Sequence, residues 1–177
     1  MSPRRHPKRL FAVDQNFPEP IISTLTVSLG EFTELVPVRN IGDGLGDVDD
    51  WELLLALYRD ERPWDGLITC DAEMLVQPKE MVVLAQTSLT LVVTEATGHN
   101  PIKAVGTLLC HLAHVCHATT QERAQVWRLK VSQKQPEQPT HYIDTIASRR
   151  GANVGDIWAM NKLSNFQLHG PGPDEQE

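Results

Sequence analysis

Two acidic residues follow a short apolar run in residues 66–75, whose sequence is Gly-Leu-Ile-Thr-Cys-Asp-Ala-Glu-Met-Leu. The apolar run is too short for a helix and ends at Thr69, so we predict a buried strand with Asp71 and Glu73 at its carboxyl end. Open α/β sheets bind their ligands at that edge. Asp71 is therefore the first candidate for site chemistry, with the alternative that it only N-caps the next helix.

Acids also stand at two other predicted element ends. The apolar run at 10–13 predicts a first strand with Asp14 at its tip and Asn16 just beyond. A loop rich in glycine and aspartate ends at Asp49 and Asp50, where a helix is predicted to begin. Either acid of this pair could serve only to stabilise the helix N-terminus through the helix dipole.

These acids are predicted to meet at one edge of a sheet. In a parallel sheet with right-handed crossovers, the first and third strands bring their carboxyl ends together. Clustered carboxylates repel one another unless a cation neutralises them, and their oxygens suit Mg²⁺ or Mn²⁺. Such an ion activates water and stabilises the charge that develops in phosphodiester cleavage. The sequence thus predicts a Mg²⁺ or Mn²⁺ site that contains Asp14, Asp71 and one or both of Asp49 and Asp50.

The remaining pattern alternates strands and helices, which indicates an α/β fold with a mostly parallel central sheet. Strands are predicted at 10–13, 32–38, 66–70, 89–93 and a last, half-exposed one at 124–131. Helices are predicted at 21–29, from 50 to before 63, at 74–85, 102–117 and 141–150. We expect one domain over residues 9–131, and a linker, a short helix and a disordered tail over 132–177.

Composition favours a cytoplasmic protein with no membrane association. The 177 residues are 41% apolar and 22% charged, and no apolar run approaches the roughly 20 residues of a membrane helix or the apolar core of a signal peptide. The three cysteines lie in apolar contexts and are predicted to be reduced core thiols. The net charge of -7 is uneven, because residues 10–80 hold fifteen acids against four bases, whereas the chain from 101 holds seven against eight. This split fits an acidic, cation-binding half beside a more basic one.

Two of these segments resemble motifs of PIN-like nucleases. Residues 13–18 (Val-Asp-Gln-Asn-Phe-Pro) resemble their opening D-x-N-x-P motif, and residues 67–75 resemble their T-x-D-x-D-F segment. The resemblance covers residues 9–118 and implies a PIN-like three-layer α/β/α sandwich. It also implies a metal-dependent endoribonuclease, with RNA as substrate, that is the toxin half of a toxin–antitoxin pair. An antitoxin protein and a second copy of the chain are the further partners that it implies.

The resemblance assigns roles residue by residue. It implies that Asp14 and Asp71 are metal ligands and that Asp50, or its neighbour Asp49, is the middle acid. Glu73 would be the fourth acid or a residue that supports the ligands from behind them, although the motif usually has an aspartate there. The hydrolase would then use Asp14, Asp50, Asp71 and Glu73 as its catalytic acids.

Supporting roles fall on other residues. Asn16 and Thr69 would orient a ligand or a water molecule. The basic residues Arg123, Arg128 and Lys130 would guide the RNA backbone.

Three alternatives stay open. The chain could be a PIN-like binding or scaffold module whose acids no longer act as a catalytic set, which its acidity and Glu73 favour. A domain phosphorylated on the strand-end aspartate is disfavoured, because the lysine expected after a late strand is absent and Lys103 starts a helix instead. His111, His114 and His117 share a helix but lack a zinc-hydrolase pattern, so we predict core-edge or exposed histidines.

Overall fold

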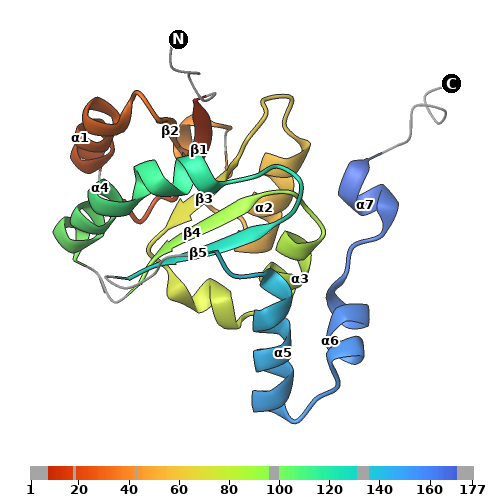
Figure 1. Cartoon of the computed structure of the whole chain (residues 1–177). Helices are drawn as coiled ribbons and strands as arrows, with labels where there is room; N and C mark the ends of the chain where they lie inside the picture. Colours follow the sequence, from red (N-terminus) through yellow and green to blue (C-terminus); the bar gives the residue numbers. More distant parts are fainter. Residues whose placement is uncertain (1–7, 18, 43, 96–99, 131–135, 171–177) are drawn as a thin grey trace, which may run out of the picture.

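The computed structural model describes residues 8–17, 19–42, 44–95, 100–130 and 136–170 as an α/β protein (Figure 1). Five parallel strands form one sheet in the order β2-β1-β3-β4-β5. The strands are β1 (Arg9–Val13), β2 (Thr33–Pro37), β3 (Gly66–Thr69), β4 (Thr90–Thr94) and β5 (Gln125–Leu129). Residues 1–7, Pro18, Asp43, residues 96–99, residues 131–135 with the start of the predicted linker, and the tail from 171 lie outside the described residues.

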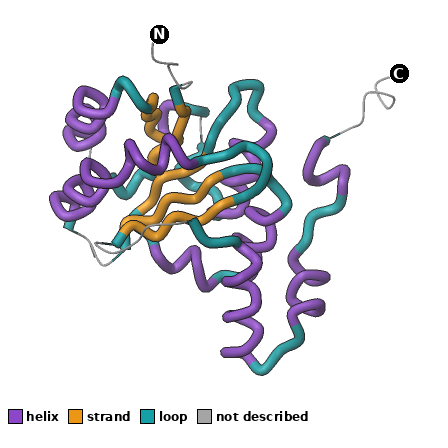
Figure 2. The backbone as a smooth tube through the Cα atoms, viewed as in Figure 1, coloured by secondary structure: helices purple, strands orange, loops and turns teal. Residues whose placement is uncertain are grey.

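Helices cover both faces of the sheet, which makes a three-layer α/β/α sandwich (Figure 2). The α-helices are α1 (Glu19–Leu29), α2 (Asp50–Arg59), α3 (Pro78–Ala85), α4 (Pro101–Ala118), α5 (Pro139–Arg150), α6 (Val154–Asn161) and α7 (Asn165–His169). Two 3₁₀ turns, η1 (Val38–Asn40) and η2 (Ala72–Val76), follow β2 and β3. The predicted fold class is confirmed, and none of the helices in the described part of the chain is long and apolar enough to cross a membrane.

Local sequence signals set where the helices begin. Proline occupies the first turn of α3, α4 and α5, where its missing N–H leaves no hydrogen bond unmade. The Asn100 side chain caps α4 by accepting hydrogen bonds from the backbone N–H groups of Ile102 and Lys103. These signals explain why the main helices could be placed from sequence.

Alternate residues of each strand enter two separate cores. Phe11, Ile68 and Trp127 pack on the face that α1 and α4 cover. Ala12 and Leu67 pack on the opposite face, against α2 and α3. Because both faces are buried, the strands read as continuous apolar runs, as is typical of parallel sheets.

The helices α3 and α4 lie on opposite faces of the sheet, although both connections step in the same direction along the strand order. The β4–α4–β5 connection therefore has the opposite hand to β3–α3–β4. The β1–α1–β2 connection runs in the opposite direction along the strand order, and α1 lies on the face opposite to α3. Because each of these two differences reverses the hand, this connection has the same hand as β3–α3–β4. The expectation that all crossovers share one right-handed sense is wrong for β4–α4–β5. The space beside α3 is consequently open to α5, which packs there.

The strand β5 is buried rather than half-exposed as predicted. Trp127 is 1% exposed, since α4 covers it, and only Arg128 of this strand is partly accessible. On the outer edge of β5, Val126 exchanges two backbone hydrogen bonds with Glu137, at 2.7 and 2.8 Å. The bridge covers part of the outer edge of the sheet.

The cysteines occupy three different environments. Cys116 is buried and Cys70 is half-buried, but Cys110 is exposed on α4, so the prediction of core thiols is wrong for Cys110. All three are free thiols.

The C-terminal part contains two helices that the sequence did not predict, α6 and α7. The helices α5 and α6 pack against α3, and Arg59 of α2 donates hydrogen bonds to the backbone carbonyls of Phe166 and Leu168 in α7, both at 3.2 Å. A cation at the carboxyl end of a helix is favoured by the helix dipole. Residues 136–170 thus pack on the same face as α2 and α3.

A buried ion pair fixes the amino edge of the sheet. The Asp65 carboxylate, 4% exposed, lies 2.9 Å from Nη1 of Arg9 and accepts hydrogen bonds from the Leu10 N–H at 2.8 Å and the Gln121 amide at 3.1 Å. Arg9 also donates to the carbonyls of Cys116, at 3.1 Å, and Thr119 at the end of α4. The pair therefore links β1, the start of β3 and α4.

We predict that Asp65→Asn lowers the free energy of unfolding by about 3 kcal/mol, because it leaves the Arg9 charge without its buried partner. The control is Asp60→Asn, which removes the partner of Arg62 from a more exposed pair and should cost about 1 kcal/mol or less. Urea denaturation of both variants measures the difference. Equal losses would contradict the assignment of Arg9 and Asp65 as a fold-defining pair.

Candidate functional site

Asp14 and Asp71 stand at the carboxyl ends of adjacent central strands, and Thr69 joins them. The register pairs Val13 with Ile68, so Asp14 lies beside Thr69. The Thr69 hydroxyl donates to Oδ2 of Asp14 at 2.8 Å and accepts from the Asp71 backbone N–H at 2.9 Å. Thr69 is fully buried and Asp14 is 8% exposed, so this chain of hydrogen bonds is protected from water.

The place where these acids stand is the switch point of the sheet. From β1 the chain moves outward to β2 and then returns to β3 on the other side of β1. In open α/β sheets, the carboxyl ends of two strands that diverge in this way border a crevice, which is the usual ligand position. The two acids predicted from sequence flank that position.

Asp50 approaches them from the start of α2. Asp49 is the N-cap residue of α2 and is exposed, whereas Asp50 is the first helical residue and is half-buried. The loop before α2 passes close to the β1–α1 turn, since a Cβ on Gly46 would lie 2.9 Å from Oε1 of Gln15. Glycine at this position lets the loop lie beside the residue that follows Asp14.

The charges of these carboxylates act on Asp50. Burial, followed by the negative charges of Asp14 and Asp71, raises the pKa of Asp50 from 3.8 to about 6, with smaller contributions from Glu80 and Asp49. Of the two neighbours that sequence could not separate, Asp50 is half-buried and is influenced by the strand-end acids, whereas the Asp49 side chain is exposed. Asp50 is the acid that the structure brings to them.

Glu80 is an acid of this site that sequence reasoning missed. Burial is the main cause that raises its pKa, and the charge of Asp49 adds to it. Its Oε2 atom is buried and has no hydrogen-bond partner in the described structure. Its position in the first turn of α3, two residues after Pro78, reads as an ordinary helix-start acid, so the sequence carries no signal for it.

Of two further predicted site residues, Glu73 does not act on Asp50, whereas Asn16 contacts Asp14. The Glu73 side chain is exposed, and its charge is not among those that act on Asp50. Its backbone N–H donates to Oδ1 of Asp71 at 2.7 Å, so Asp71 also N-caps η2. The Asn16 amide donates to Oδ2 of Asp14 at 2.9 Å, which supports the predicted orienting role.

The fit to a metal ion rests on oxygens that lack partners. Among the described residues, Oδ1 of Asp14 and the Asp50 carboxylate accept no hydrogen bond, and Glu80 holds the orphaned oxygen. All-oxygen donor sets suit Mg²⁺ and Mn²⁺. However, no three Asp, Glu, His or Cys residues within the described ranges stand close enough together to form a metal group. The oxygen donors therefore suit Mg²⁺ or Mn²⁺, but in this structure they stand further apart than the ligands of one ion do.

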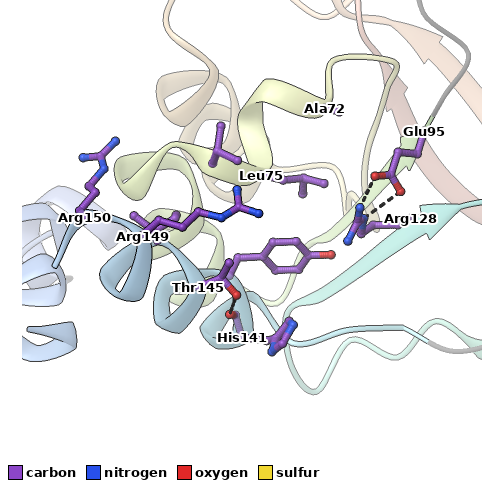
Figure 3. A pocket seen from close by; sticks show the side chains of 11 residues that line it. Ala72, Leu75, Glu95, Arg128, His141, Thr145, Arg149 and Arg150 are labelled. Carbon is purple, nitrogen blue, oxygen red and sulfur yellow. Dashed lines mark hydrogen bonds and ion pairs between the residues drawn. The ribbon is translucent and has the colours of Figure 1, made fainter. Parts of the chain in front are cut away.

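A pocket with basic residues adjoins these acids at the same edge of the sheet. It lies between η2 and α5 and includes Glu95 and Arg128 from the ends of β4 and β5 (Figure 3). Arg128 pairs with Glu95, with Nε to Oε2 at 3.0 Å, and Lys130 lies 2.7 Å from the same carboxylate. Arg123 precedes β5 and therefore stands at the opposite, amino edge, away from the acids.

Two further expectations are resolved by position. His114 packs on Trp127 at 5.6 Å between ring centroids and His117 on Phe32 at the same distance, as core-edge residues do. The statement that no lysine follows a late strand is wrong, because Lys130 comes directly after β5. Its ammonium pairs with Glu95 rather than with Asp71.

No protein-family model, curated protein or solved structure matches the chain. The geometry above therefore carries the functional argument by itself.

We predict that Asp50→Asn stabilises the metal-free protein. A carboxyl whose pKa is raised by folding favours the native state only at low pH, and that contribution is lost as the pH rises through about 6. In EDTA near pH 8, the asparagine should add about 1 kcal/mol to the free energy of unfolding, after allowance for solvent screening. Near pH 4 the difference should vanish.

The control for this prediction is Asp47→Asn, which removes an exposed charge from the same loop. Thermal melts of both variants and wild type across this pH range measure the effect. Destabilisation by Asp50→Asn near pH 8 would contradict the proximity of Asp50 to the strand-end acids.

Proposed function

We propose that the protein is a Mg²⁺- or Mn²⁺-dependent endoribonuclease. The observation that carries the proposal is the approach of Asp50 to Asp14 and Asp71 at the switch point of the sheet, with carboxylate oxygens left without partners. Repulsion among these charges is a standing cost that a bound cation would remove. The resemblance of residues 13–18 and 67–75 to PIN-like motifs supports the same class of enzyme.

Asp14, Asp50 and Asp71 would hold the ion, and Glu80 would complete the set of acids. When bound, the ion lowers the pKa of a water molecule and stabilises the charge that develops on the phosphodiester. Thr69 and Asn16 fix the orientation of Asp14 by donating to one of its oxygens, which leaves the other free to bind. Such support of ligand orientation is typical of metal sites.

A second candidate is a nucleic-acid-binding module without cleavage activity. The observation that favours it is that no three potential ligands of the described chain lie at metal-binding distance. It differs from the first candidate in one measurable respect, since RNA would bind and remain intact in Mg²⁺ and Mn²⁺. Toxin activity through RNA cleavage requires the first candidate, whereas an antitoxin and a homodimer are compatible with either, and all three rest on the resemblance alone.

We predict that the protein cleaves single-stranded RNA in Mg²⁺ or Mn²⁺ and that EDTA stops cleavage. Asp14→Asn and Asp71→Asn should each lower the rate about 100-fold or more, because each removes a ligand. Glu80→Gln should also lower it, whereas Glu73→Gln, at an exposed acid outside the cluster, should keep most of the activity.

Gel analysis of a labelled RNA over time provides the measurement, with folding of each variant checked by circular dichroism. Cleavage by Asp71→Asn at the wild-type rate would contradict the proposed site. Intact RNA with wild-type protein in both metals, together with RNA binding, would favour the second candidate.

A further inference from the structure

The pocket beside the acid site has the size of a small-ligand site. Its volume is about 520 Å³, within the roughly 300–1,000 Å³ that such sites occupy. The turn η2 supplies one wall and α5 the other, with Glu95 and Arg128 at one end (Figure 3). The α5 wall lies beyond residues 9–118, so the resemblance to PIN-like nucleases does not account for the pocket.

The pocket is positive in a protein whose net charge is -7. Three arginines and one glutamate line it, and the glutamate, Glu95, forms an ion pair with Arg128. Arg149 and Arg150 are exposed, and the side chain of neither makes an ion pair or hydrogen bond with another described residue. Figure 3 shows Arg149 extending towards η2 and Arg150 lying further out along the helix. Exposed guanidinium groups without an ionic partner are suited to phosphate, which they bind through paired hydrogen bonds.

Apolar surface lies next to these charges. Leu75 of η2 and Ile146 of α5 line the pocket, together with the ring of Tyr142. Tyr142 is held in place from both sides, because its hydroxyl donates to Glu137 and the guanidinium carbon of Arg128 lies 5.9 Å from its ring centroid. An apolar wall beside unpaired arginines suits a nucleotide, whose base and ribose contact the wall while its phosphate meets the arginines.

The pocket also touches the acid site through the chain itself. Ala72 lines the pocket and directly follows Asp71, so their Cα atoms are about 3.8 Å apart. A nucleotide chain that leaves the pocket past Ala72 therefore reaches the candidate ligands at once. A recessed pocket admits an unstacked nucleotide, which a single strand offers and a duplex does not.

We propose that this pocket binds one nucleotide of single-stranded RNA, with its phosphate on Arg149 and Arg150, and positions the neighbouring phosphodiester at the acid site. The inference rests on the proposed function and names the part of the substrate that the enzyme holds. Arg128 and Lys130 are then structural, since both are engaged by Glu95, and Arg123 has no role in binding.

Binding in EDTA tests the inference without cleavage. Fluorescence anisotropy with a labelled oligouridylate of about ten nucleotides gives the dissociation constant at several salt concentrations. The double variant Arg149→Gln/Arg150→Gln should bind about 10-fold more weakly and lower the slope of log affinity against log salt by about 1 to 2. The matched control Arg123→Gln, also an exposed arginine, should bind as wild type does.

The outcomes separate this inference from the proposed function. Wild-type affinity of the double variant, equal weakening by Arg123→Gln, or tighter binding of duplex RNA than of the single strand would each overturn the pocket assignment. Binding through the pocket by a protein that never cleaves RNA would leave the pocket assignment in place and defeat the nuclease. RNA cleavage that depends on Asp71, together with unchanged RNA affinity of the double variant, would support the nuclease and overturn the pocket assignment.

Discussion

The hydrogen bond from Thr69 to Asp14 joins the carboxyl ends of β1 and β3, and the acid site depends on it. It forms because the parallel register sets Val13 beside Ile68, which places the next residues of both strands side by side. The same hydroxyl accepts from the Asp71 N–H and so fixes where the chain turns into η2. One buried threonine thereby sets the positions of two acids that are 57 residues apart in the numbering of the sequence.

The acids at the two edges of the sheet have opposite surroundings. At the amino edge, Asp65 is buried and fully engaged by Arg9, Leu10 and Gln121, so the charge there stabilises the fold. At the carboxyl edge, burial and then the negative charges of Asp14 and Asp71 raise the pKa of Asp50 to about 6. Carboxylates that raise one another's pKa are characteristic of sites that act on a ligand, since folding alone does not benefit from their repulsion.

The sequence was sufficient for the features that local patterns encode. Apolar runs predicted the five strands, and prolines in the first helical turns helped to place the helices. Acids at the predicted strand ends identified Asp14 and Asp71 as candidates. It could not separate Asp49 from Asp50, because adjacent residues of a helix start differ only in the direction they face. Glu80 and the pocket under α5 were out of reach, because both arise from packing between distant segments, and so does the hand of β4–α4–β5.

A thermal melt of wild type and Asp14→Asn in EDTA and in millimolar Mn²⁺ tests the central claim most directly. A cation that binds only the native state raises the melting temperature by mass action. The account predicts a rise with Mn²⁺ in the wild type and none in Asp14→Asn, although the variant itself should be folded. An unchanged wild-type melting temperature in Mn²⁺, or an equal rise in both proteins, would contradict a cation site at the carboxyl ends of β1 and β3.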